Sequence, residues 1–184
     1  MLTRLFGFCA SLLMLTMTAS AQLPEAPPEM KLYKQDVGTW DCAVKFYFDP
    51  AAEPVESKAT EVNKMLGDMW MVSEFTGEIM GAPFQGAAQM GYDPAKKKYV
   101  SNWIDSMSPF TIQMEGTWDE KTKTMTSTGM MKDPTGAEMP GKWVVVYKNE
   151  NEHKMTMSSK PAGAKDYVVM MEVAYKRRAE AKGK

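Results

Sequence analysis

Three acidic residues lie in otherwise apolar or aromatic stretches and are the first candidates for chemistry: Glu74, Asp105 and Glu172. Burial disfavours a charged carboxylate and raises its pKa, which suits such a group to act as an acid or to anchor a ligand. Residue alternation places Asp105 on one strand face with Trp103, and Glu172 with Met170. Either face can point inward, although a solvent-facing or salt-bridged position is the more common outcome for each carboxylate.

Methionine is the second candidate, because the chain has 19 of them. Met69 with Met71, and Met155 with Met157, are spaced to share a strand face. Thioether sulfur is a soft ligand that suits Cu(I), and it can also take up oxidant. Methionine is equally a flexible filler of irregular cores, and its scatter along the chain favours that interpretation.

The single histidine, His153, limits metal and nucleophilic chemistry. A zinc site with several histidines cannot form, and the usual catalytic triads lack their central base unless His153 itself serves. A lone histidine could still hold haem axially, and the haem-binding nitrobindins are barrels of similar outline. His153 follows the polar stretch 149–152, however, which predicts an exposed position. Neither Gly-x-Ser-x-Gly nor a phosphate-binding glycine pattern occurs, so the sequence leans away from an enzyme and predicts no cofactor or metal.

The first 21 residues have the pattern of an export signal. Arg4 precedes the uncharged stretch 5–17, and Ala19-Ser20-Ala21 fits the small-x-small pattern of a signal peptidase site. The uncharged stretch would span about 20 Å as a helix, less than the roughly 30 Å of a hydrocarbon core. We expect cleavage after Ala21 and a periplasmic or secreted protein. Cys42 then has no disulfide partner and is expected to be a small buried apolar residue.

Composition indicates one globular domain. The chain has 184 residues, 44% of them hydrophobic and 24% charged, and a formal net charge of −1, so no excess of positive charge favours nucleic acid. We divide it into a signal peptide at 1–21, a proline-rich leader at 22–29, a β-barrel domain at 30–178 and a basic disordered tail at 179–184.

Most of the domain is predicted to be β-strand. A short helix is expected over 29–36, and from Gly38 onward Trp40, Cys42, Val44, Phe46 and Phe48 alternate with more polar residues. Nine turn signals rich in Gly, Pro, Asp and Asn separate ten expected strands. Consecutive strands with short connections must be antiparallel, and a meander removes its exposed edges by closing on itself. The sequence therefore predicts an all-β, single antiparallel up-and-down barrel.

Several strings together resemble one family: Val37-Gly38-Thr39-Trp40, Trp70-Met71-Val72-Ser73-Glu74-Phe75, Gly81-Ala82-Pro83-Phe84-Gln85-Gly86, Gly91-Tyr92-Asp93, Trp103-Ile104-Asp105-Ser106-Met107 and Met171-Glu172-Val173-Ala174-Tyr175-Lys176-Arg177. In order and spacing they are similar to the bacterial domain-of-unknown-function family fifteen-seventy-nine. The resemblance implies a lipocalin-like, calycin-type barrel, often secreted and without established activity. It also implies that Gly38, Trp40 and Arg177 close the barrel, with the guanidinium over the indole face.

A barrel of this size leaves room for side chains or one small ligand, so we expect a small apolar or amphipathic molecule to bind inside. The residues expected to line the site are Trp70, Phe84, Tyr92, Trp103, Trp143, Asp105 and Glu172. One alternative is a methionine-based Cu(I)-binding or oxidant-buffering protein. Another is a packed scaffold that acts through a protein partner. No nucleic acid or integral membrane association is expected, and the oligomeric state stays open.

Overall fold

The structure of the chain is a computed structural model that describes residues 25–49 and 52–179. The expected export signal, the beginning of the proline-rich leader and residues 180–184 of the tail lie outside the described residues. The leader's described part does not stay extended throughout, because a 3₁₀ turn, η1, already begins at Pro28.

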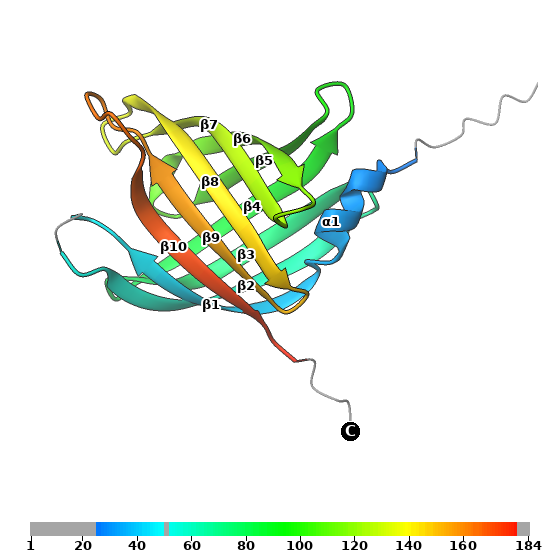
Figure 1. Cartoon of the computed structure of the whole chain (residues 1–184). Coiled ribbons are helices and arrows are strands. Elements are labelled where there is room, and N and C mark those ends of the chain that lie inside the picture. Colours follow the sequence, from blue (N-terminus) through cyan, green and yellow to red (C-terminus); the bar gives the residue numbers. More distant parts are fainter. Residues whose placement is uncertain (1–24, 50–51, 180–184) are drawn as a thin grey trace, which may run out of the picture.

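Ten antiparallel strands form one closed barrel in which each strand pairs with its neighbour in sequence (Figure 1). This confirms the predicted fold. Pairing of the first strand with the last closes the sheet, with Val44 opposite Val173 and Cys42 opposite Tyr175. The strands are β1 (Gly38–Phe46), β2 (Val55–Leu66), β3 (Trp70–Ile79), β4 (Ala82–Asp93), β5 (Lys98–Asp105), β6 (Ser108–Asp119), β7 (Thr124–Lys132), β8 (Glu138–Asn149), β9 (Glu152–Ser159) and β10 (Val168–Arg177).

Side-chain alternation explains which face of the sheet turns inward. Along β1, Trp40, Cys42 and Val44 are buried, whereas Asp41 and Lys45 of the alternate row are exposed. Because successive side chains of a strand point to opposite faces, one apolar row covers the interior and one polar row faces water. Cys42 is thus a buried free cysteine, as expected.

Phe48 does not continue the inward row of β1. The strand ends at Phe46, and Phe48 lies in the following loop with 63% of its surface exposed, although its ring stacks on Phe46 at 6.0 Å between centroids. The inward row ends with the strand, because the connection to β2 already begins at residue 47.

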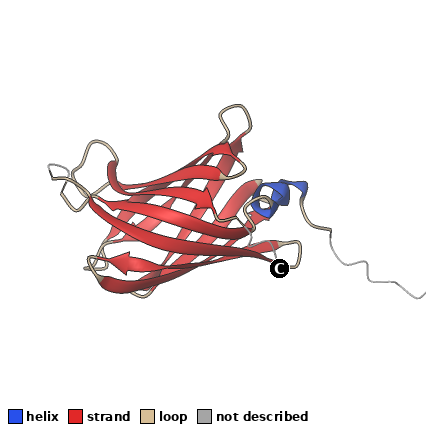
Figure 2. Ribbon diagram, turned by 90° about the horizontal axis from the view of Figure 1, so that it is seen from below, coloured by secondary structure: helices blue, strands red, loops and turns tan. Residues whose placement is uncertain are grey.

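The two ends of the barrel differ in what covers them (Figure 2). We call the end that carries the N-terminal helix the helix end; its strand connections are 67–69, 94–97, 120–123 and 150–151. The opposite end, here the loop end, has connections at 47–54, 80–81, 106–107, 133–137 and 160–167. Within the described residues no helix covers the loop end.

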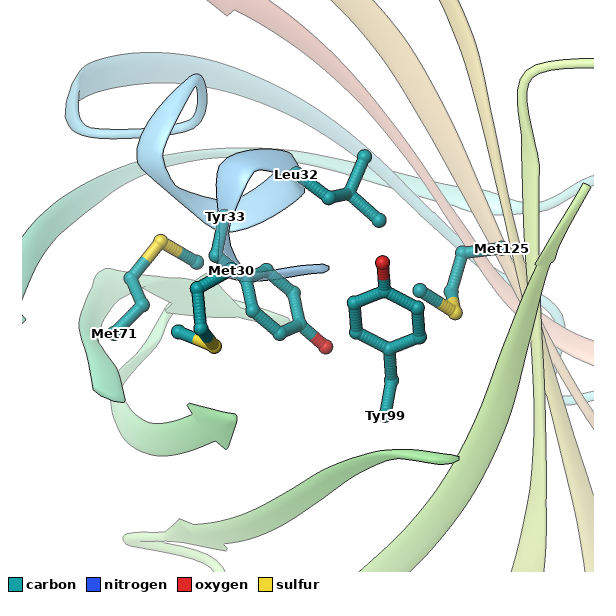
Figure 3. Packing of buried hydrophobic residues seen from close by; sticks show 6 residues of the cluster. All are labelled: Met30, Leu32, Tyr33, Met71, Tyr99 and Met125. Carbon is teal, nitrogen blue, oxygen red and sulfur yellow. The ribbon is translucent and has the colours of Figure 1, made fainter. Parts of the chain in front are cut away.

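The helix end is plugged by the N-terminal segment, in which η1 (Pro28–Met30) runs into the single-turn helix α1 (Lys31–Lys34). Proline suits the first turn of a helix, where no N–H partner is needed. The ring of Tyr33 meets that of Tyr99 edge-on at 5.5 Å, and Tyr99 Oη donates to the Glu29 carbonyl at 3.2 Å. This plug, η1 with α1, forms one buried cluster with side chains of the barrel strands: Met30, Leu32, Tyr33, Met71, Tyr99 and Met125 (Figure 3).

Among the described residues, none of the helices has the length and apolar character that crossing a membrane would require.

Candidate functional site

Gly38, Trp40 and Arg177 meet where β1 begins and β10 ends. The Arg177 guanidinium carbon lies 4.2 Å from the centroid of the Trp40 ring, a cation–π distance. Arg177 also donates to the carbonyls of Val37, at 2.6 Å, and Glu150, at 3.1 Å. Gly38 has φ +132°, and a Cβ there would stand 2.9 Å from Arg177 Nη1, so glycine leaves space for the guanidinium. This group fastens the helix end of the barrel.

The barrel encloses a cavity of about 300 Å³. Four of the predicted ligand-binding residues lie on its wall: Phe84, Trp103, Trp143 and Asp105. The volume lies at the lower end of the range of about 300 to 1,000 Å³ that is typical of small-molecule sites. The cavity can therefore hold one small molecule.

One half of the cavity, towards the loop end, is aromatic. Phe84 and Trp103 stack with centroids 6.4 Å apart, and Phe75 meets both rings edge-on at 6.0 and 6.2 Å. Gly86 allows this arrangement, because a Cβ at that position would lie 2.2 Å from Trp103 Cζ2. The missing side chain lets the indole lie flat against the wall. Trp103 Nε1 donates to Asp105 Oδ2 at 2.9 Å, which occupies that donor.

Thioether groups complete much of the apolar wall. The pair Met155 and Met157 shares the inward face of β9, as predicted, and both residues line the cavity. Met71 lines it too, whereas Met69 precedes β3 and lies in a connection. The cavity-lining methionines are Met71, Met90, Met125, Met155, Met157 and Met171.

The other half of the cavity, towards the helix end, carries a polar cluster. Its members are Asp36, Glu61, Asn63, Tyr147 and Tyr175, all on the cavity wall. Tyr147 Oη donates to the Asp36 carboxylate, and Asn63 Nδ2 donates to Glu61 Oε1 at 2.9 Å. The cavity therefore has an aromatic half and a half with two carboxyl groups.

Burial changes the titration of this cluster. It raises the pKa of Asp36 to about 7, and the hydrogen bond from Tyr147 offsets only part of that rise. Burial also raises the pKa of Glu61, against the lowering effect of hydrogen bonds from Asn63 and Tyr175. The nearby Glu61 carboxylate adds to the rise at Asp36. Both groups thus hold a proton more readily than free carboxyl groups do.

Four polar side chains on the wall have an atom without a hydrogen-bond partner among the described residues: Asn63 Oδ1, Ser73 Oγ, Trp143 Nε1 and His153 Nδ1. Asn63 Oδ1 is an acceptor on a side chain only 2% exposed, and Trp143 Nε1 is a donor. Buried polar groups in folded proteins nearly always have a partner, so these atoms are available to a bound molecule or to water.

His153 is buried, so its predicted exposed position is wrong. It is the second residue of β9 and only 9% exposed, with ring centroids 4.3 Å from Tyr175, 4.5 Å from Trp40 and 5.0 Å from Tyr147. Burial lowers its pKa to about 4, and the positive charge of Arg177 adds to this. The imidazole is therefore neutral near pH 7.

Three predicted ligand-binding residues do not lie on the cavity wall. Trp70 is 42% exposed on the outer face, where its ring lies over Gly91. Tyr92 points inward but packs against the plug at the helix end, with its ring edge-on to Tyr99 at 5.2 Å. Glu172 faces outward.

Glu172 forms a small outer network that explains its position on β10. Its Oε1 accepts from Lys154 Nζ at 2.6 Å and its Oε2 from Tyr47 Oη at 3.0 Å. The hydrogen bond from Lys154 is the main reason that its pKa is lowered. Glu74 is also exposed on the outer face. Only Asp105 of the three carboxylates first considered reaches the cavity.

Glu61 and Asp36 are the carboxyl groups that the sequence did not single out. A signal for Glu61 exists, because the alternate residues of β2 on its side, Ala59, Asn63 and Met65, carry no charge, while the other row contains Lys58 and Lys64. Asp36 has no such signal, since it lies between α1 and β1. The described residues contain no group of three or more His, Cys, Asp or Glu side chains placed to hold a metal ion.

Comparisons with known proteins agree with this fold. The family model described as "Protein of unknown function (DUF1579)" matches residues 25–177. Rv2717c from M. tuberculosis has a similar structure, with a TM-score of 0.62 and 10% sequence identity, over 84% of this chain and 100% of that one. The S-type phycobiliprotein lyase CPES from Guillardia theta has a TM-score of 0.56 at 10% identity, over 83% of this chain and 93% of its own. No curated protein matches the sequence.

Proposed function

The chain belongs to the DUF1579 family of proteins of unknown function, and from the geometry of its interior we propose that it binds one small apolar or amphipathic molecule inside the barrel. The cavity of about 300 Å³ is the observation that supports this most directly. Well-packed protein interiors leave few voids larger than a water molecule, so a space of this size needs an explanation.

The chemistry of the wall favours an amphipathic occupant. Aromatic rings and thioethers offer dispersion contacts to an apolar body, and burying that body is worth roughly 25 cal/mol per Å². The unpartnered donor of Trp143 and the acceptor of Asn63 can orient a few polar groups. A largely apolar wall with a small number of placed polar groups is typical of small-molecule sites.

A barrel of similar fold occurs in a protein with an enzymatic name, the S-type phycobiliprotein lyase from Guillardia theta. At 10% identity the likeness concerns the fold, and the proposal for this chain rests on its own cavity.

The alternatives differ in their support. A packed scaffold requires a filled interior, which the cavity disfavours. The Cu(I)-binding or oxidant-buffering role stays a prediction; the methionines on the wall also serve the apolar site as packing groups. We further propose that the protein is exported, on the strength of its N-terminal sequence.

A pair of variants on β4 tests the binding proposal. Ala88 lines the cavity and its neighbour Ala87 lies on the other face of the strand, so Ala88→Phe fills the cavity while Ala87→Phe serves as the control. The neutral fluorophore prodan is titrated into each protein, and thermal unfolding shows that each variant is folded. We expect the Ala88→Phe variant to bind about tenfold more weakly than the other two proteins.

Native mass spectrometry of the protein from its own exported fraction completes the test. We expect a bound small molecule and a chain that begins at Gln22. Failure of the unmodified protein to bind prodan, together with an empty native protein, would overturn the binding proposal. A chain retaining residues 1–21 would overturn cleavage after Ala21, and absence of the protein from the exported fraction would overturn the proposal of export; neither result bears on ligand binding.

A further inference from the structure

The charged groups on the cavity wall are all of one sign. Asp36, Glu61 and Asp105 line the cavity, whereas none of its described lining residues is lysine or arginine. His153 also lines it and is neutral near pH 7. An anionic ligand would therefore enter a space with no positive side chain to pair with and with carboxyl groups nearby.

The nearest cation to the polar cluster is already engaged. Arg177 stacks on Trp40 and donates to the carbonyls of Gln35, Val37 and Glu150. It is not among the lining residues of the cavity. Its charge lowers the pKa of Asp36 less than burial raises it. The polar cluster thus lacks a counter-ion of its own.

The hydrogen-bonding capacity of the cluster points to a donor-rich partner. Asn63 Nδ2 is used by Glu61, which leaves Asn63 Oδ1 as an unpartnered acceptor beside that carboxylate. Asn63 is only 2% exposed, so this acceptor has no bulk water to satisfy it. An ammonium group has three donors and no acceptor, which matches a carboxylate next to an amide oxygen.

We propose that the ligand class is a lipophilic amine, whose ammonium group binds at Glu61 and Asn63 while its apolar body lies along the aromatic wall formed by Phe75, Phe84 and Trp103. This rests on the proposed function, which it makes more specific. Ion pairing in a cavity of low polarity compensates the cost of removing both charges from water only when hydrogen bonds are also made, and the Asn63 acceptor supplies one.

A matched ligand series tests the head group separately from the tail. Decylamine, decanol and decanoate share one apolar chain, and each is used to displace prodan at about pH 8, where the amine is protonated. We expect decylamine to bind about tenfold more tightly than decanol, and decanoate to bind most weakly. Equal binding of decylamine and decanol, or tighter binding of decanoate, would overturn the inference while leaving the proposed function intact. Absence of any displacement, and of prodan binding, would remove the proposed function itself.

Variants locate the recognising carboxylate. Glu61→Gln keeps the size of the side chain, and we expect it to bring decylamine and decanol within about threefold of each other while prodan still binds. Glu56→Gln changes an exposed residue on the outer face of β2; it is the matched control and should keep the preference.

Asp105→Asn removes the carboxylate at the loop end, where both oxygens already accept hydrogen bonds from Trp103 Nε1 and Met107 N. A loss of preference in Asp105→Asn but not in Glu61→Gln would contradict the proposed position of the ammonium group. If Glu61→Gln does not fold, the ligand ranking of the unmodified protein and Asp105→Asn still decides.

Discussion

The helix end and the loop end of the barrel differ in how far their apolar side chains are buried. At the helix end, η1 and α1 insert Met30, Leu32 and Tyr33 into the barrel mouth, and each is less than 9% exposed. At the loop end, large apolar side chains are turned towards solvent, with Met80 73% and Met107 60% exposed. The contrast shows that the N-terminal segment closes the helix end with buried apolar side chains, whereas these two side chains at the loop end have no such cover.

The interior follows the same division. Towards the helix end, the cavity is bounded by the polar cluster and by His153, whose ring contacts Trp40, which Arg177 fastens in turn. Towards the loop end, Phe84 and Trp103 line a wall with open volume beside it. Sites that bind ligands are commonly placed where local stability is low and are supported by a rigid region elsewhere.

The largest expected effect comes from emptying the centre of the helix end. Trp40 is 1% exposed, and its Nε1 donates to the Asp36 carbonyl at 2.9 Å. Trp40→Ala should lower the free energy of unfolding by about 3 to 5 kcal/mol in urea titrations followed by circular dichroism. Phe48→Ala at the loop end removes a ring that is 63% exposed and should cost less than about 1 kcal/mol. Equal losses in the two variants would break the comparison.

The pH dependence of stability provides the next test, through Asp36 and His153. The pKa of Asp36, about 7 in the folded protein, lies above the ordinary value of 3.8 for an aspartate. Protonated Asp36 therefore contributes to the free energy of unfolding at low pH. This contribution, on the order of 4 kcal/mol at most, is lost as the pH rises towards 7. The pKa of His153, about 4, lies below the ordinary value of 6.5 for a histidine, so its effect is opposite and stability rises with pH between those values.

These two opposing slopes can be separated by substitution. In the unmodified protein they largely cancel between about pH 4 and 6.5. Asp36→Asn should leave a free energy of unfolding that rises with pH in that range, and His153→Phe should leave one that falls. Chemical unfolding at a series of pH values measures both. Curves that keep the unmodified protein's shape in both variants would show that neither group titrates as its surroundings indicate.

A smaller effect is expected from exchanging one cation for another. Arg177→Lys loses the planar group that lies over Trp40 and reaches several carbonyls, and should cost about 1 to 2 kcal/mol. Arg178→Lys is the neighbouring control, since Arg178 pairs with Asp41 on the surface and should cost less than about 0.5 kcal/mol. If the control costs as much as Arg177→Lys, then the fastening at the helix end has been overestimated.

The sequence predicts the fold better than it predicts the interior. Alternation from Gly38 onward and the turn residues determine strand number and pairing, because each turn is short and each strand has one apolar row. The position of a side chain in the barrel is harder to predict. Trp70 and Tyr92 are both aromatic, and residue type does not indicate that one lies on the outer face and the other packs against the plug.

His153 shows why a polar neighbourhood misled the prediction. The turn before it is only Glu150 and Asn151, so β9 begins at Glu152 and His153 already belongs to its inward row. Met155 and Met157, two and four residues later, shared that row and could have indicated it. Glu61 was missed for a different reason: whether a buried carboxylate finds partners depends on residues distant in sequence, here Tyr175 on β10.

Pairing of β1 with β10 makes the last strand necessary for the first. Until Val168–Arg177 has left the ribosome, β1 and β9 each present an unpaired edge that can recruit strands from other chains. Contacts between residues so far apart in sequence form slowly, because the loop that they close is nearly the whole domain. During synthesis the unfinished chain therefore exposes strand edges that are prone to aggregation, and the closed barrel forms only after the carboxyl terminus is released.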